Sequence, residues 1–159
     1  MKKIVLASVL ALGVASPAFA ADFSGPRIGA NIGFADEDFG GTDIFTYGVN
    51  AGYDFDLGGA VAGATVEYQD SSEDPYGRDL SIVGRVGGKV GEDVLVYALA
   101  GYTNLGVEGT GVELDGARVG AGIEAGFASR FYGNVEYRYS NYELDAEGHQ
   151  VLFGLGVRF

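Results

Sequence analysis

The chain has 159 residues, of which 28 are Gly and none are Cys or Trp, and its formal net charge at pH 7 is -12. Disulfide bonds and thiol chemistry are therefore excluded. So acidic a chain also lacks the basic surface that binding to nucleic acid phosphates requires. Beyond the N-terminal region, no run of about 18 apolar residues provides a membrane-spanning helix.

The N-terminal region has the pattern of a secretory signal peptide. Lys2 and Lys3 precede an apolar run over residues 4–14, and Ser16 begins a segment that ends in a small-x-small cleavage site at Ala20. The apolar run is too short to be a transmembrane helix. We therefore expect residues 1–20 to be removed, which leaves one mature domain over residues 21–159.

Eight later segments alternate apolar and polar residues with the period of two that is typical of β-strands. The last ten residues are the clearest case, because Val151, Phe153, Leu155, Val157 and Phe159 form one wholly apolar face. The expected strands cover residues 26–35, 44–55, 60–69, 80–90, 94–105, 117–128, 131–142 and 150–159. The segment 94–105 is apolar on both faces, so its orientation stays open.

Strands of roughly ten residues cross a bilayer when they are tilted, and an even number closes into a barrel without a free edge. We therefore predict an all-β fold, namely an eight-stranded antiparallel up-and-down transmembrane β-barrel. The expected connections alternate between short turns near 56–59, 91–93 and 129–130 and longer loops at 36–43, 70–79, 106–116 and 141–149. In outer-membrane barrels the longer loops are extracellular.

The four longer loops make the predicted extracellular rim acidic. Only Arg78, and His149 when protonated, offsets their negative charge. They carry Asp36, Glu37, Asp38, Asp43, Asp70, Glu73, Asp74, Asp79, Glu108, Glu113, Asp115, Glu143, Asp145 and Glu147.

The runs EYRYSNY (136–142) and GLGVRF (154–159) resemble the seventh and eighth strands of small eight-stranded outer-membrane barrels, the OmpA-type or porin family. This resemblance implies an outer-membrane location, contact with lipid and lipopolysaccharide, and recognition of Phe159 by the barrel-insertion machinery. No cofactor is expected, and the sequence leaves the oligomeric state open, with a monomer favoured. The further periplasmic, peptidoglycan-binding domain of OmpA itself is not expected here, since the chain ends with the barrel.

Aromatic residues gather near the ends of the expected strands, as in the two aromatic girdles of such barrels. The residues assigned to these girdles are Phe34, Phe45, Tyr47, Tyr53, Phe55, Tyr68, Phe127, Phe131, Tyr139, Tyr142 and Phe159.

The polar strand faces collect charged residues that the barrel would enclose. Eight strands leave an interior just wide enough for side chains, and buried charges need partners. These residues are Glu67, Arg85, Lys89, Arg118, Glu124, Glu136, Arg138 and Arg158. They either plug the lumen or line a narrow pore. With Arg27 they number six bases against three acids, which favours anions inside, whereas the acidic rim attracts cations.

Other chemistry is weakly indicated. The acidic cluster 36–38 has no EF-hand spacing, and a solvated surface explains it equally well. Residues 120–125 match GxGxxA, but another strand follows instead of a helix. His149 is the only His in the chain. Outer-membrane lipid A deacylases use a His-x-Ser pair on one strand, but here Val151 occupies the position of that Ser. Ser140 and Glu143 lie across the adjacent loop, where they could complete a Ser–His–acid set with His149. We therefore expect no catalytic, cofactor or metal site.

The leading functional prediction is a non-enzymatic outer-membrane protein with a structural or envelope-surface role. The alternatives are a narrow, low-conductance pore for ions or small solutes, and an adhesin or partner-binding surface that uses the acidic loops. A soluble lipocalin-like barrel is disfavoured, because the chain has no Trp for the early Gly-x-Trp of that family and its polar faces are rich in Gly.

Overall fold

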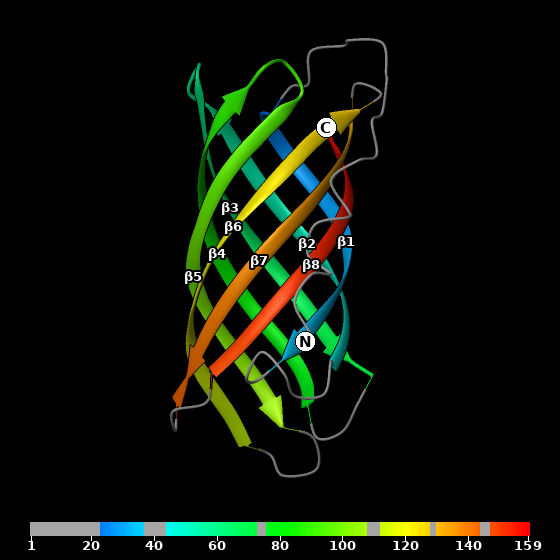
Figure 1. Ribbon diagram of the computed structural model, residues 1–159, viewed down its shortest axis with the longest axis vertical. Coiled ribbons are helices and arrows are strands. Elements are labelled where there is room, and N and C mark those ends of the chain that lie inside the picture. The colour runs from blue at the N-terminus through cyan, green and yellow to red at the C-terminus, as the bar shows by residue number, and fades with distance from the viewer. Residues whose placement is uncertain (1–22, 37–43, 73–75, 108–111, 128–129, 144–146) are drawn as a thin grey trace, which may run out of the picture.

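The computed structural model describes residues 23–36, 44–72, 76–107, 112–127, 130–143 and 147–159 (Figure 1). These residues form a closed antiparallel barrel in which each strand pairs with the next and the last pairs with the first. The strands are β1 (Gly25–Asp36), β2 (Ile44–Asp56), β3 (Ala60–Ser71), β4 (Tyr76–Val90), β5 (Val94–Val107), β6 (Val112–Phe127), β7 (Phe131–Tyr142) and β8 (Glu147–Arg158).

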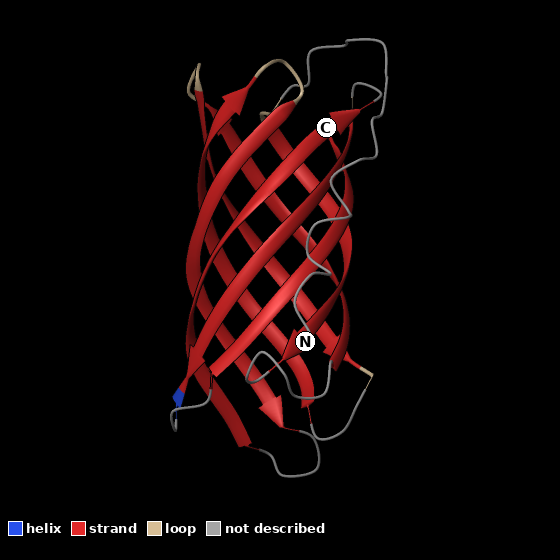
Figure 2. Ribbon diagram, in the orientation of Figure 1, coloured by secondary structure: helices blue, strands red, loops and turns tan. Residues whose placement is uncertain are grey.

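The predicted fold class and all eight predicted strands are confirmed. Figure 2 shows that strand makes up nearly all of the described chain, and none of the helical structure within it is long and apolar enough to cross a membrane. The short connections near residues 57–59 and 91–93 lie at the same end of the barrel as the C-terminus, and the ends of β1, β3, β5 and β7, which the longer connections follow, lie at the other end (Figure 1). We call these the short-turn end and the long-loop end.

Several strands are longer than predicted, chiefly at the long-loop end. The pairing of β5 with β6 continues as far as Val107 opposite Val112, so part of the expected loop 106–116 is strand. The apolar alternation stops earlier because the chain leaves the membrane there, whereas backbone hydrogen bonding continues. Hydrophobic periodicity therefore underestimates strand length at this end.

The orientation of β5, which the sequence leaves open, is fixed by its neighbours. Residues that pair directly across two strands point to the same face. Leu99 lies opposite Arg85 of β4, and Leu95 lies opposite Glu124 of β6. Since both charged residues are buried, the odd-numbered side chains of β5 point into the barrel and the even-numbered ones point outward.

The outer face of the barrel is apolar and exposed along every strand. Ile28, Val49, Ile82, Val119 and Leu155 are each at least half exposed. In water, so extensive an exposed apolar surface would promote aggregation, whereas in a membrane it is covered by lipid. Polar side chains and Gly occupy the inner face, so the polarity is the reverse of that in a soluble barrel.

Aromatic pairs mark both ends of the apolar outer face. Phe34 and Phe45 pack with ring centroids 5.7 Å apart near the long-loop end, and Phe127 and Phe131 pack 6.1 Å apart near the short-turn end. Tyr142 was wrongly assigned to a girdle. Its hydroxyl is inside the barrel and donates to Asp79 Oδ2 at 3.1 Å, because the even-numbered side chains of β7 point inward.

Glycines on the inner face leave the room that larger polar side chains use. A Cβ atom on Gly63 would lie 2.0 Å from Asp54 Oδ1, and one on Gly122 would lie 2.7 Å from Glu136 Cγ. Each of these glycines is beside a buried carboxylate. The high Gly content thus permits charged side chains to fill a narrow lumen.

Candidate functional site: a charge-filled lumen

The centre of the lumen is crossed by Arg138, which is 1% exposed. It extends from β7 to β3, two strands that lie diametrically opposite in the closed order. Its Nη1 and Nη2 atoms lie 2.5 and 2.9 Å from the two carboxylate oxygens of Glu67. Its Nε donates to Glu136 Oε2 at 2.7 Å. One guanidinium therefore joins opposite walls with bidentate geometry, the strongest form of this pair.

Further donors complete the hydrogen bonding of Glu136. The Tyr97 hydroxyl donates to its Oε1 at 2.5 Å, and Asn134 Nδ2 donates to the same oxygen at 3.0 Å. These donors come from β5 and β7. The central carboxylates are therefore held by charge and by neutral donors together, as buried ions require.

A second cluster lies toward the short-turn end and contains two fully buried carboxylates, Asp54 and Glu124. Arg85 bridges them, at 2.6 Å from Asp54 Oδ2 and 2.8 Å from Glu124 Oε2. Arg158 bridges the same two from β8, at 3.2 and 2.5 Å. Arg27 Nε lies 2.9 Å from Asp54 Oδ2 without hydrogen-bond geometry, so this contact is electrostatic only. The cluster links β1, β2, β4, β6 and β8.

A third cluster lies toward the long-loop end around Arg118. Its Nη2 is 2.5 Å from Asp79 Oδ2, and its Nε donates to Ser140 Oγ at 2.9 Å. Its Nη1 donates to Ser81 Oγ at 3.2 Å. Thr103 donates to the other Asp79 oxygen at 2.5 Å.

The prediction that basic residues outnumber acidic residues in the lumen is wrong. Three acids beyond those expected, Asp54, Asp79 and Asp56, pair with interior bases, the last of them with Lys89. Asp79 was placed in an acidic loop, yet it is 8% exposed inside the barrel. The register irregularity between Tyr76 and Asp79 precedes it. Asp79 is two residues before Ser81, which was assigned to the polar face, and this period-two spacing is the sequence signal that Asp79 also faces inward.

Little space remains among these side chains. A cavity of about 10 Å³, lined by Asn50, Glu67, Asn134 and Arg138 among others, is what the described residues enclose at mid-lumen. This volume holds roughly one water molecule. Asn50 Oδ1 is buried without a protein partner, which gives such a water an oxygen to donate to. The lumen is therefore filled with side chains.

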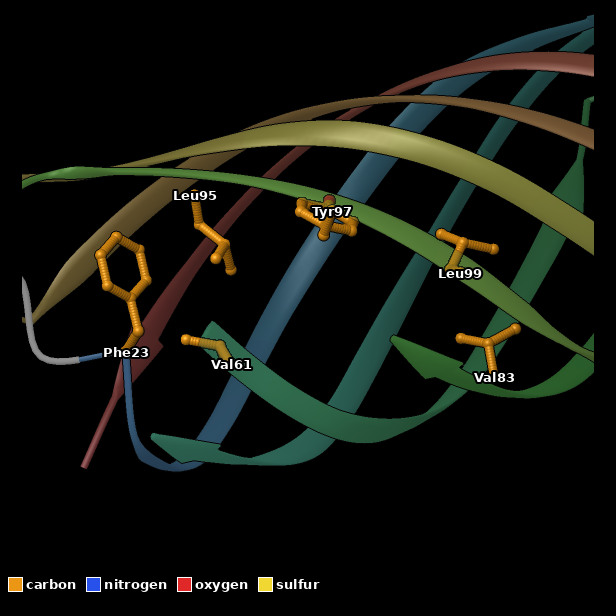
Figure 3. Close-up of a cluster of buried hydrophobic side chains, with 6 residues drawn as sticks. All are labelled: Phe23, Val61, Val83, Leu95, Tyr97 and Leu99. Atoms are coloured by element: carbon orange, nitrogen blue, oxygen red, sulfur yellow. The ribbon is translucent and has the colours of Figure 1, made fainter. Parts of the chain in front are cut away.

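Phe23 closes the short-turn end, and it was missed at the sequence level. It is 1% exposed and packs in a cluster with Val61 and Leu95 (Figure 3). The guanidinium carbon of Arg158 lies 5.3 Å from its ring centroid, and Lys89 Nζ lies 5.9 Å from it, both within cation–π range. A single Phe before the first strand carries no sequence pattern that would reveal this position.

Gly25 supports the Phe23 position by its backbone conformation. Its φ of 96° is in the left-handed region that favours Gly. A Cβ atom there would also lie 2.6 Å from the carbonyl oxygen of Phe159. Close approach to the last residue of the chain and a positive φ both require Gly at the start of β1.

The residues weighed for catalysis are not brought together. Ser140 is buried in the lumen and bound to Arg118. His149 Nδ1 contacts the hydroxyl of the exposed Tyr137 at 2.7 Å, and its ring lies 5.1 Å from that of Tyr139. Glu143, the acid of the set, follows β7 beyond Tyr142. The serine and the histidine therefore engage different faces of the barrel wall.

The remaining sequence candidates are also placed. Residues 120–125 lie within β6, in a strand and not in a phosphate-binding turn. In the acidic cluster, Asp36 ends β1, and residues 37–38 lie outside the described residues. Within the described part of the chain, no three His, Asp or Glu side chains are arranged to hold a metal ion.

Comparison with known proteins identifies similar sequences and structures. Residues 4–159 match the family described as "Outer membrane protein beta-barrel domain". The chain is 30% identical over 152 residues to a 22 kDa outer membrane protein of Rhizobium leguminosarum bv. viciae, covering 75% of this chain and 70% of that protein.

Two solved structures illustrate the shared fold. The N-terminal β-barrel domain of Pseudomonas aeruginosa OprF has a TM-score of 0.62 and 17% identity, covering 86% of this chain and 99% of that one. The outer membrane enzyme PagL has a TM-score of 0.58 and 16% identity, covering 84% and 99%. At these identities the likeness shows the fold alone.

Replacing Arg138 with Ala should destabilise the barrel by about 3–5 kcal/mol, because it leaves two buried carboxylates without their cation. Urea unfolding of the refolded protein in lipid vesicles, followed by circular dichroism, measures this loss. Arg130→Ala, at an exposed position in a short turn, is the matched control and should unfold like the wild type. An Arg138→Ala protein as stable as the control would contradict the network.

Replacing Phe23 with Ala should also destabilise the barrel, by about 3–5 kcal/mol, because it empties a buried aromatic site. The same urea titration applies. Leu57→Ala is the control, since Leu57 is 65% exposed in the turn at the same end. Equal stability of the two variants would show that Phe23 does not close this end.

Proposed function

The chain belongs to the outer membrane β-barrel protein family and is located in the outer membrane, and from this premise we propose that its role there is structural. It acts as a sealed, non-enzymatic barrel that contributes to envelope integrity and gives the cell an acidic surface. The observation that carries the proposal is the Arg138–Glu67 pair across the full width of the lumen.

The filled lumen disfavours the alternative of a pore. An ion that crosses the barrel must displace Arg138 from its two carboxylates and then pass Phe23 at the short-turn end. Separating a buried pair leaves an uncompensated charge in a low-dielectric interior, which costs several kcal/mol. The balance of interior charges also removes the preference for anions that a basic lumen would give.

The positions of the polar residues support the absence of catalysis. The fold itself is compatible with catalysis, since the outer membrane enzyme PagL shares it. Here the hydroxyl of Ser140 is held by Arg118 inside the barrel, where no base reaches it. His149 engages Tyr137 and Tyr139 on the outer face, so this serine and this histidine do not form a nucleophile–base pair.

A partner-binding surface remains a separate candidate and has weaker support. Residues 37–43, 73–75, 108–111 and 144–146, which carry seven of the fourteen loop acids, lie outside the described residues. Charge alone therefore favours such a role. The barrel contacts membrane lipid and lipopolysaccharide through its exposed apolar face whichever role the loops have.

Two further features concern export and assembly. Residues 1–20 act as a signal peptide, so that the mature chain begins at Ala21. The insertion machinery reads the C-terminal strand that ends at Phe159. This residue suits that role, because its side chain is 65% exposed and its backbone N–H donates to Pro26 at 3.0 Å, where the barrel closes.

Single-channel recording tests the structural role directly. Refolded mature protein in a planar bilayer should give no discrete current steps across a salt gradient, because side chains fill the lumen. Folding is verified by the shift in gel mobility on heating, and a known open porin in the same bilayer is the control. Reproducible steps from folded protein would make it a pore, and their reversal potential would give the charge of the permeant ion.

Expression of the full chain in Gram-negative cells tests export and assembly. N-terminal sequencing of the outer-membrane fraction should begin at Ala21. Phe159→Ala should lower the amount of barrel in that fraction, because the insertion signal is lost, yet the variant should refold normally from urea in vitro. Loss of refolding in vitro would show that Phe159 serves stability instead of insertion.

A further inference from the structure

A buried side chain follows the expected signal-peptide cleavage site almost immediately. The peptide bond between Ala20 and Ala21 is separated from Phe23 by Ala21 and Asp22 alone. Phe23 is fully buried at the short-turn end of the lumen. The bond that export requires to be cut is therefore tied, by two residues, to a side chain inside the barrel.

Contacts from three strands hold Phe23 in its site. Val61 of β3 and Leu95 of β5 pack with it in one apolar cluster (Figure 3). The guanidinium carbon of Arg158, from β8, lies 5.3 Å from the centroid of its ring. These three strands are brought around Phe23 by the closed order of the barrel, so the site exists in the folded protein and is lost in the unfolded chain.

The backbone after Phe23 is also fixed. Gly25 pairs with Asp54 at the first position of the β1–β2 ladder. The carbonyl oxygen of Pro26 accepts the backbone N–H of Phe159 at 3.0 Å, at the seam between β1 and β8. The chain downstream of the cleavage site therefore has no slack to release when Phe23 is seated.

The length of the two-residue link limits how far the scissile bond can lie from the barrel. An extended chain advances at most about 3.3–3.6 Å per residue, so the bond cannot lie more than about 10 Å from the Phe23 backbone. A protease domain of about 100 residues already has a radius of gyration of about 13 Å. Since proteolysis needs an exposed segment that the protease can enclose, the link is too short to present the bond.

The membrane restricts access at the same end of the barrel. Phe131 and Phe159 are both more than half exposed on the outer face at this end, where lipid covers the aromatic girdle. A protease that approaches the bond in the folded barrel would therefore meet the strand ends and the membrane surface together.

We propose that the seating of Phe23 closes the signal-peptide cleavage site, so that signal peptidase processes the unfolded precursor and not the folded one. This inference rests on the proposed signal peptide over residues 1–20. Cleavage consumes one water molecule, breaks the amide bond, and leaves a carboxylate on Ala20 and an ammonium group on Ala21. In the folded precursor Phe23 must first leave its site, and emptying a buried aromatic site is costly. Hydrolysis must therefore precede closure of the barrel.

The test measures cleavage of the full precursor by purified signal peptidase in detergent micelles. Precursor diluted from urea with the peptidase present is compared with precursor that has folded first, as verified by the shift in gel mobility on heating. The folded sample should be cleaved roughly 100- to 1,000-fold more slowly, because the rate follows the fraction in which Phe23 is unseated. Equal initial rates would overturn the proposal. Absence of cleavage before Ala21 in the unfolded sample would refute the signal peptide itself, and this inference with it.

Two variants separate the seating of Phe23 from the stability of the barrel. Phe23→Ala should restore rapid cleavage of the folded precursor, whereas Leu57→Ala, at an exposed position in the turn at the same end, should not. In the second variant, about ten Gly and Ser residues inserted between Asp22 and Phe23 lengthen the link by about 17 Å and leave Phe23 seated. This precursor should unfold like the wild type in urea, yet be cleaved when folded at nearly the rate of the unfolded chain. A lengthened precursor that resists cleavage when folded would overturn the proposal.

Discussion

The bond on which the rest of the structure depends is the bidentate pair between Arg138 and Glu67. Eight strands close around an interior whose width one arginine and one carboxylate fill. Once a charge is placed in such an interior, it needs a partner, because an isolated buried ion is strongly destabilising. Each inward-facing base therefore requires an acid on another strand. The glycines beside these acids, such as Gly63 next to Asp54, provide the space that the pairs need.

The lumen changes character along its length. Apolar residues return at both ends, with Phe23 against Val61 and Leu95 at the short-turn end and the Ala35–Ile44 and Leu105–Leu114 pairs at the long-loop end. Phe23 keeps water from the fully buried Asp54 and Glu124, so it raises the strength of their ion pairs. The aromatic ring also contacts Arg158 directly. The packing of Phe23 at the short-turn end and the charge network therefore stabilise each other.

The sequence predicts those parts of this architecture that are local to one strand. Period-two alternation predicts the number of strands and, for seven of the eight, which side chains face lipid and which face the lumen. It can do so because each strand separates lipid from lumen independently. It does not predict features that depend on a neighbour. The orientation of β5 depends on Arg85 and Glu124, and Asp79 faces inward because β4 extends beyond its apolar run. The packing of Phe23 against Val61, Leu95 and Arg158 exists only after the barrel has closed.

The distribution of charge distinguishes the two ends in function. Within the described residues the interior bases are matched by acids, so the lumen contributes little to the potential at the long-loop mouth. That potential is set by the rim, where carboxylates outnumber bases. Cations are therefore attracted to a mouth whose floor is closed by the Arg118 and Arg138 clusters. An open channel with the same rim would conduct cations, whereas this barrel attracts them to a closed mouth.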